Sequence, residues 1–347
     1  MRTSCRRIWL GCCQVFLMNR KFIIGFVLAV VLGSSCHKSN PADDGSPPCI
    51  DPGIVPASPY DSPIWHPSGE FIGFNHTPLR DITYPSPCNP RQEFDYDSTG
   101  FWLIKPDGTE KRRIFTRTLL APAWSPDGEW IAYCEPAGGG VQIFKMRFTG
   151  NGFDTSTRVQ LTTYGRNFYP AWSPDGKWIA YDRSICEGPR TCGVWVVTAD
   201  GQDARWLFGA SFPAWFPDGG SLIGVIGASS ATAGTKFVLY SIGESRFVDT
   251  LDGVGTDNRL PTYSTSGSSV AFWASGNLWV MDKYGNQRYQ LTTSGVDVDF
   301  GLPFSWSPAG DKIVYTRYQP DDWTMGNGIL YVIDLGSGNE TRLTNNP

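Results

Sequence analysis

An all-β fold is predicted by this sequence, in the form of a six-bladed β-propeller made of four-stranded antiparallel blades. Two observations predict it. A motif containing Pro-x-Trp-Ser-Pro-Asp-Gly, followed by an apolar segment, recurs along the chain, and its clearest copies are 121–133 and 169–181. The composition also favours strands and turns, because aromatic residues make up 14% of the 347 residues and Gly (39) and Pro (26) are frequent.

The spacing of the motif sets the size of the repeat. Each copy carries one large aromatic residue at the same point, and these residues are Trp65, Trp124, Trp172, Trp215, Tyr263 and Trp306. Consecutive members lie 43 to 59 residues apart, which is the length of a four-stranded propeller blade. One extra residue precedes Trp306, which predicts a bulge there.

Each unit supplies four strands, which we call A to D in chain order. Strand A carries the aromatic residue and ends at Ser-Pro-Asp-Gly, a hairpin turn in which Pro fixes φ and Gly takes the left-handed conformation. Strand B, such as 130–133, is apolar on both faces, as expected of a strand between neighbouring blades. Strand C, such as 194–198, ends at a second Gly turn, and a short outer strand D, such as 288–292, completes the unit. Because each unit keeps its own four strands, we expect the ring to close without strand exchange, through side chains alone. Trp65 and Phe74 should then pack against Ile313, Tyr315 and Tyr331 at this seam, and a latching strand from 49–55 is the alternative.

This unit resembles the propeller repeats of the TolB-like family over residues 62–344. The resemblance rests on the Trp-Ser-Pro-Asp-Gly motif, on the Val-Met-Asp strand at 280–282 and on the outer strands that end in Leu-Thr. It implies the fold and leaves the function open, since such repeats occur in many propellers. The chain has no room for the additional N-terminal domain of TolB.

The first 36 residues predict an export signal. Arg20 and Lys21 precede an apolar run at 22–32, which is too short to span a membrane and matches a secretory signal. Small residues then precede Cys36, an arrangement that resembles a bacterial lipobox and implies a lipid on the Cys36 sulfur. We expect translation to start at Met18. A signal peptide cut near Ser35, or an uncleaved anchor, is the alternative.

The rest of the chain divides into a tether and the propeller. Residues 37–60 are rich in Pro, Ser, Asp and Gly, which predicts a flexible tether, and 61–347 form the propeller. The predicted protein is an outer-membrane lipoprotein that faces the periplasm or the cell surface.

The cysteines predict a disulfide and no metal centre. Cys186 and Cys192 flank a turn-forming stretch, and export places them in an oxidising compartment, so we expect a bond between them. A bond between Cys49 and Cys88 is a weaker alternative, and Cys134 is expected to be a buried free thiol. The chain has no Cys-x-x-Cys pair and only 3 His, so no metal cofactor is expected.

Strand order predicts where a binding site would lie. The A–B and C–D turns share one face of the ring, the far face, and the B–C and D–A loops share the other, the near face. Near-face loops are long at 75–100 and 317–327, and loops on rigid scaffolds often carry binding residues. The candidate binding residues are Arg166, Asn167, Tyr169, Asp257, Asn258, Arg259, Asp299, Phe300, Tyr318 and Trp323. For any single one, an ordinary solvated loop residue is the alternative.

The function predicted from these features is non-enzymatic. A net charge of -4 argues against nucleic-acid binding, and neither Gly-x-Ser-x-Gly nor His-Glu-x-x-His occurs. The acidic pairs at 297/299 and 321/322 could bind Ca²⁺, but such pairs are usually only solvated. We expect a binding or scaffold propeller that engages a periplasmic or surface protein through its near face. Glycan or peptidoglycan binding is the alternative, followed by a propeller lyase or hydrolase.

Overall fold

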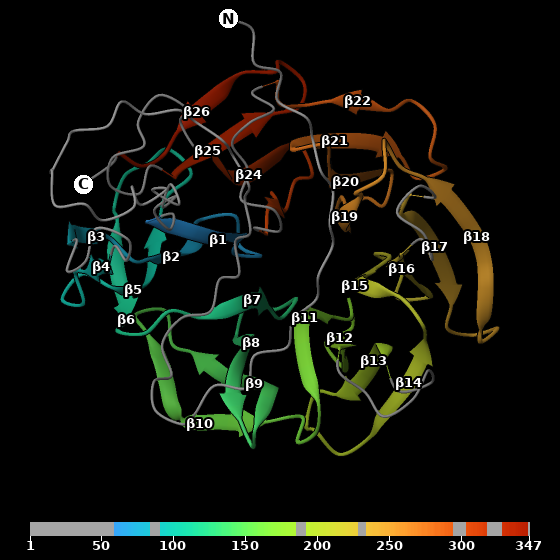
Figure 1. Cartoon of the computed structure of the whole chain (residues 1–347), viewed down its shortest axis with the longest axis horizontal. Helices are drawn as coiled ribbons and strands as arrows, with labels where there is room; N and C mark the ends of the chain where they lie inside the picture. The colour runs from blue at the N-terminus through green and yellow to red at the C-terminus, as the bar shows by residue number, and fades with distance from the viewer. Residues whose placement is uncertain are drawn as a thin grey trace, which may run out of the picture. The chain divides into compact units, whose positions relative to one another are not determined.

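The computed structural model describes residues 59–83, 91–184, 192–227, 234–293, 303–317 and 328–345. The chain divides into two compact units, Met1–Ser34 and Ser35–Pro347, and all described residues belong to the second. Their regular secondary structure is entirely β-strand, arranged as sheets that follow one another around a ring (Figure 1). None of the described residues forms a helix long and apolar enough to cross a bilayer.

Strand pairing follows the predicted order of strands A to D. Four sheets of the described chain contain four strands each, and these are β1 (Tyr60–Trp65), β2 (Ile72–His76), β5 (Gly100–Ile104) and β6 (Arg112–Phe115); β15 (Ser211–Trp215), β16 (Ser221–Ile226), β17 (Lys236–Ser241) and β18 (Arg246–Asp252); β19 (Arg259–Tyr263), β20 (Ser269–Ala274), β21 (Asn277–Asp282) and β22 (Tyr289–Gln290); and β23 (Ser305–Trp306), β24 (Lys312–Arg317), β25 (Ile329–Asp334) and β26 (Glu340–Arg342).

A larger sheet contains eight strands, which are β7 (Leu120–Trp124), β8 (Trp130–Ala137), β9 (Gly140–Phe148), β10 (Phe153–Gln160), β11 (Arg166–Trp172), β12 (Trp178–Ser184), β13 (Gly193–Thr198) and β14 (Ala204–Phe208). It consists of two antiparallel runs of four, joined where β11 and β9 pair in parallel at Arg166 and Val141. The sheets of the ring therefore have four to eight strands, and the predicted all-β fold is confirmed.

Five of the six described strands A pair with a register shift, and β23 pairs without one. In β11, Phe168 pairs with Asp182 and Ala171 with Ala180, so two residues oppose one. Proline has no N–H to give to the ladder, and the residue before it takes a positive φ between 47° and 54°. The residues with this conformation are Ser62, Ala121, Tyr169, Phe212 and Leu260. The sequence predicted a bulge only before Trp306, where the β23–β24 pairing has no register shift, and it missed the bulges of the other five strands.

Three of the repeated tryptophans join neighbouring units through the indole N–H, whereas Trp65 donates within its own unit and Trp124 Nε1 has no partner among the described residues. Trp172 Nε1 donates to the carbonyl oxygen of Ala123 at 3.1 Å, and Trp215 Nε1 donates to that of Ala171 at 3.0 Å. Trp306 repeats the contact with the preceding unit. The acceptor stands directly before the aromatic residue of the previous unit, so the motif supplies both partners. This contact explains the choice of Trp, since a phenylalanine of similar bulk has no donor.

The Ser-Pro-Asp-Gly turn satisfies its own polar groups. The carboxylate of Asp127 accepts from the hydroxyl of Ser125 and from the N–H of Glu129, and Gly128 has φ +72°. A side chain at Gly128 would also meet His66 of the preceding unit, whose ring lies 2.6 Å from where a Cβ would stand. The motif aspartate is thus a turn residue, and His66 packs against the next turn as a structural residue.

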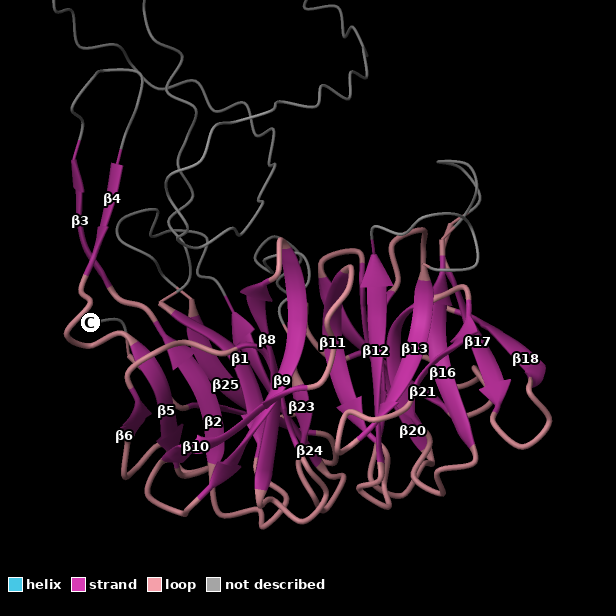
Figure 2. Ribbon diagram, turned by 90° about the horizontal axis from the view of Figure 1, so that it is seen from below, coloured by secondary structure: helices cyan, strands magenta, loops and turns pink. Residues whose placement is uncertain are grey.

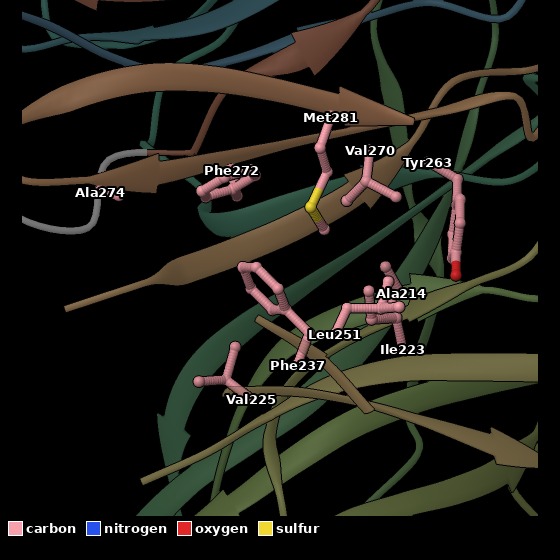
Figure 3. Packing of buried hydrophobic residues seen from close by; sticks show 10 residues of the cluster. All are labelled: Ala214, Ile223, Val225, Phe237, Leu251, Tyr263, Val270, Phe272, Ala274 and Met281. Atoms are coloured by element: carbon pink, nitrogen blue, oxygen red, sulfur yellow. The ribbon is translucent and has the colours of Figure 1, made fainter. Parts of the chain in front are cut away.

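The ring closes where the last sheet meets the first. Among the described strands, β1 pairs only with β2 and β26 only with β25, so no strand is exchanged. Trp65 and Phe74 pack in this seam against Val314, Leu330 and Val332. Residues 49–55, which could add a latching strand, lie outside the described residues. The junction between β15–β18 and β19–β22 is built in the same way, from interleaved apolar side chains (Figure 3).

One prediction about this seam is wrong. The sequence placed Ile313, Tyr315 and Tyr331 there, but all three pack on the opposite side of their sheet, in the cluster that contains Trp273. Successive side chains of a strand point to opposite faces, so a shift of one residue exchanges the two junctions. Polar contacts also cross the seam, because the N–H of Trp65 donates to Ser305 Oγ at 3.0 Å.

Candidate functional site

The two faces of the ring differ in structure. The A–B and C–D turns lie on the far face, whereas the near face carries a projecting hairpin formed by β3 (Leu79–Thr83) and β4 (Arg91–Phe94) (Figure 2). The two strands of this hairpin pair only with each other within the described chain. The sequence predicted a long loop here and missed the hairpin, whose strands are short and mostly polar. Two residues after β4, where the chain returns to the ring, lies an exposed aromatic side chain, Tyr96.

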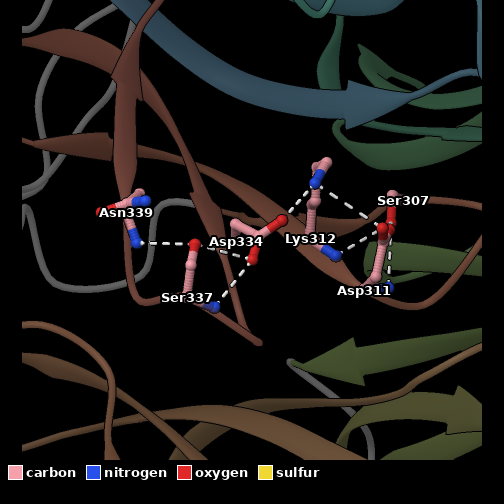
Figure 4. Close-up of polar contacts among 6 residues, drawn as sticks. All are labelled: Ser307, Asp311, Lys312, Asp334, Ser337 and Asn339. Carbon is pink, nitrogen blue, oxygen red and sulfur yellow. Dashed lines mark hydrogen bonds and ion pairs between the residues drawn. The ribbon is translucent and has the colours of Figure 1, made fainter.

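Polar side chains of the far face are used within their own turns. In the last sheet, Asp334 accepts from the N–H and the hydroxyl of Ser337 and forms an ion pair with Lys312 (Figure 4). Beside it, the carboxylate of Asp311 accepts from the hydroxyl of Ser307. These contacts hold the pKa of Asp334 well below its usual range. The described part of the chain contains no cluster of potential metal ligands.

Asn167 stabilises a near-face loop through hydrogen bonds, and its side chain is inaccessible to a binding partner. Its side chain is 0% exposed, and its amide nitrogen donates to the carbonyl oxygens of Val141 and Tyr164. Its amide oxygen accepts from Arg183 Nε at 3.0 Å. The predicted contact role is therefore corrected to a structural one, because every direction around this amide is occupied by the protein.

Asn258 has the same role in a second near-face loop. It is 0% exposed, its amide nitrogen donates to the carbonyl oxygen of Thr235, and its amide oxygen accepts from the N–H of Val254. Asp257, directly before it, is half-buried and accepts from the N–H of Ser275 at 2.9 Å. The loop between β18 and β19 is thus held by internal hydrogen bonds, and Asn258 cannot reach a partner.

Three further candidates lie on strands A at the start of their sheets. Arg166 is exposed, whereas Tyr169 and Arg259 are half-buried. The ring of Tyr169 packs edge-on against Phe212 at 4.8 Å, and both contact the cluster that contains Leu260. Burial raises the pKa of the Tyr169 hydroxyl. Tyr169 is therefore part of an apolar cluster shared by several units, and Arg166 is the candidate most open to a partner.

The other sequence candidates lie outside the described residues. These are Asp299, Phe300, Tyr318 and Trp323 of the near face, the lipidation site Cys36, and Cys186. Cys192 is disulfide-bonded, and its pairing with Cys186 stays a prediction. Cys134 is a buried free thiol, as expected.

Sequence reasoning missed a buried arginine on the near face. Arg183 is only 8% exposed, and its guanidinium lies 3.9 Å from the ring centroid of Trp195. Next to it, burial raises the pKa of Asp182 to about 6, against the weaker opposing effect of hydrogen bonds from Ser211 and from the N–H of Phe212. The signal in the sequence was the charged pair Asp182-Arg183, which interrupts an otherwise apolar strand B. This pair could have predicted the two buried charged residues.

Two cavities accompany these features. One of about 420 Å³ lies on the far face between β11–β14 and β15–β18, with Trp178, Trp215, Asp175 and Asp218 in its lining. Another of about 330 Å³ lies at the ring seam. It is lined by Tyr60, His76, Ile104, Gly108, Lys111, Leu343, Thr344 and Asn345. Burial lowers the pKa of both His76 and Lys111 there.

A ring of antiparallel sheets around a central axis is the class of fold called a β-propeller. No protein-family model and no curated protein matches the sequence. Among solved structures, TolB from Acinetobacter baumannii is similar with a TM-score of 0.59 and 20% identity, over 79% of this chain and 63% of that one. A putative TolB from Agrobacterium tumefaciens gives 0.54 and 20% identity, over 68% of this chain and 84% of that one.

These comparisons show that the chain has the fold of the TolB-like propellers, as the repeat motif predicted. The chain spans less than two thirds of the length of the Acinetobacter protein. At this level of identity the likeness concerns the fold alone, because propellers of one shape serve many functions.

Proposed function

We propose that this chain is an exported, non-enzymatic six-bladed propeller with four-stranded blades, which binds a protein of the cell envelope through its near face. The observation that carries the proposal is the difference between the two faces. Far-face turns use their polar groups internally, as at Asp127 and Asp334, whereas the near face presents the β3–β4 hairpin and Tyr96. Projecting loops on a rigid scaffold are a common basis for recognition.

The hydrogen bonds of the polar groups at the site support a non-enzymatic role in this proposal. Asn167 and Asn258 are fully buried and hydrogen-bonded, and His66 packs against Gly128. The Nδ1–H of His76 donates to the carbonyl oxygen of Pro59 at 2.8 Å. These groups stabilise the scaffold, so a partner would recognise the described near face by its shape and charge.

Removal of the hairpin tests the near face. Replacement of residues 80–94 by a short Gly-Ser linker should abolish capture of the partner from cross-linked intact envelopes while leaving the melting temperature almost unchanged, because β3 and β4 pair only with each other. The far-face substitutions Glu129→Ala and Lys177→Ala are the controls, since exposed substitutions rarely cost more than about 0.5 kcal/mol.

Two outcomes would contradict this assignment. Loss of capture only in the far-face variants would show that the wrong face was chosen. If immobilised peptidoglycan retained this protein and no cross-linked partner protein were recovered, the alternative of glycan binding would be favoured.

The proposed location in the envelope depends on Cys36, which lies outside the described residues. The apolar run at 22–32 followed by small residues before Cys36 supports a lipid-anchored protein of the outer membrane, facing the periplasm or the cell surface. Radiolabelled palmitate should enter the wild-type protein and not Cys36→Ala. Equal labelling of the two proteins would contradict lipidation.

A further inference from the structure

The near-face end of β12 holds a buried cation whose contacts are all with neutral groups. Arg183 donates from Nε to the amide oxygen of Asn167 at 3.0 Å and from Nη2 to the hydroxyl of Tyr181 at 3.1 Å. Its guanidinium stacks on Trp195, with the ring centroid of Tyr164 at 5.8 Å. Arg183 forms no ion pair with any residue that the structure describes. A buried charge without a counter-charge is unfavourable, so this arrangement calls for an explanation.

The same chain shows how such an arginine is normally neutralised. Arg158 lies 3.9 Å from the ring centroid of Phe144, donates to the hydroxyl of Tyr133 and forms an ion pair with Glu135 at 3.0 Å. An arginine over an aromatic ring and beside a tyrosine hydroxyl therefore has a carboxylate as its third partner here.

The last sheet repeats this arrangement in the strand position of Arg183. Arg317 lies 4.4 Å from the ring centroid of Tyr331, donates to the hydroxyl of Tyr315 and forms an ion pair with Glu340. Tyr331 holds the place of Trp195, because each is the stacking residue of its strand C. In two of the three arginine sites the protein supplies the carboxylate itself.

Strand pairing identifies what the third site lacks. Glu340 on β26 pairs with Ile333, two residues after Tyr331, and Ala204 on β14 pairs with Val197, two residues after Trp195. Ala204 thus stands where the carboxylate stands in the last sheet. It is exposed, so the place that a carboxylate would fill opens to solvent.

One nitrogen of the guanidinium is left to bind a ligand. Arg183 Nη1 has no acceptor within the described chain, and it is not among the buried polar atoms that are sealed from solvent without a partner. A guanidinium N–H without an acceptor favours an anionic ligand with oxygen acceptors.

We propose that Arg183 forms a carboxylate-binding site, which takes an aspartate or glutamate side chain of an acidic protein segment. The ligand's carboxylate would occupy the position that Glu340 occupies beside Arg317. The choice of a protein segment rests on the proposed function, whereas the carboxylate site rests on the geometry of Arg183 alone.

The missing carboxylate can be supplied by mutation. Ala204→Glu should raise the melting temperature, because it neutralises Arg183, and should block the site. Arg183→Met should remove the site and lower the melting temperature, because it leaves the buried amide oxygen of Asn167 without its donor. The matched change Arg317→Met, at an arginine that already has a carboxylate partner, should leave peptide binding unchanged. The probe is a fluorescent, C-terminally amidated hexaglutamate peptide measured by anisotropy at low salt, with the hexaglutamine peptide as its control.

The expected result is binding of hexaglutamate and not hexaglutamine by the wild-type protein, weakened at least about tenfold in both Ala204→Glu and Arg183→Met. Wild-type affinity in either variant would overturn the site. Binding of oligogalacturonate in place of the peptide would keep the carboxylate and overturn the protein ligand. If Ala204→Glu captured the envelope partner as well as the wild-type protein does, Arg183 would not be part of the surface that binds that partner. The proposed role of the near face would then be tested by the hairpin experiment alone.

Discussion

Replacement of Phe74 by alanine is expected to lower the free energy of unfolding by about 3–5 kcal/mol, the usual cost of removing a buried aromatic side chain. Phe74 is 0% exposed and lies in the seam that closes the ring, with Val314 and Val332 opposite. Chemical denaturation followed by tryptophan fluorescence measures the loss. Tyr284→Ala is the exposed control, since Tyr284 is 66% exposed, and it should change stability little.

Phe272→Ala is the matched variant at another junction, and it shows whether the seam is weaker than that junction. Phe272 occupies the equivalent place on β20, where it pairs with Trp279 as Phe74 pairs with Trp102, and it is equally buried. The seam lacks the chain connection that links other neighbouring sheets. We therefore expect hydrogen exchange to be faster in β1 and β26 than in β19 and β18, the strands A and D at the junction of Figure 3. Equally slow exchange in all four strands would contradict a weak seam.

The pH dependence of stability should change when Asp182 is replaced by asparagine. The folded pKa of about 6 lies above the ordinary value of 3.8, because the carboxyl is buried. The folded protein therefore binds more protons than the unfolded chain between these values, so stability falls as pH rises through this window. The full shift corresponds to about 3 kcal/mol lost between low pH and pH 7.

Asp182→Asn keeps the shape of the side chain and an acceptor oxygen for Ser211, but it does not titrate. The free energy of unfolding of the wild-type protein, relative to this variant, should fall as pH rises from 4 to 7 and stay level above that. Urea denaturation at several pH values measures the difference. A constant difference across this range would show that Asp182 has an ordinary pKa. Asp334→Asn is an acidic control from the far face, where the carboxylate is partnered by Lys312 and Ser337.

Much of the fold could be predicted because its causes are local. The turn at 125–128 follows from the φ of Pro, the hydrogen bonds of Ser and Asp and the left-handed Gly, all of which are set by neighbouring residues. The repeated aromatic residue then fixes the length of the unit. The candidate site was harder to predict. From the sequence Asn167 is expected to be an exposed loop residue, but the surrounding loops bury it.

The all-β architecture, the repeat and the turn chemistry could be predicted from the chain alone, since each is signalled by residues close together in the sequence. Which side of a strand faces which neighbour became known from the packing of the strands, and Tyr315 lies at the junction opposite to the seam. The tertiary structure also decided that Arg183 lacks a carboxylate while Arg317 has one. The physical reason is that burial and charge balance depend on partners from other strands, which no single segment of the chain contains.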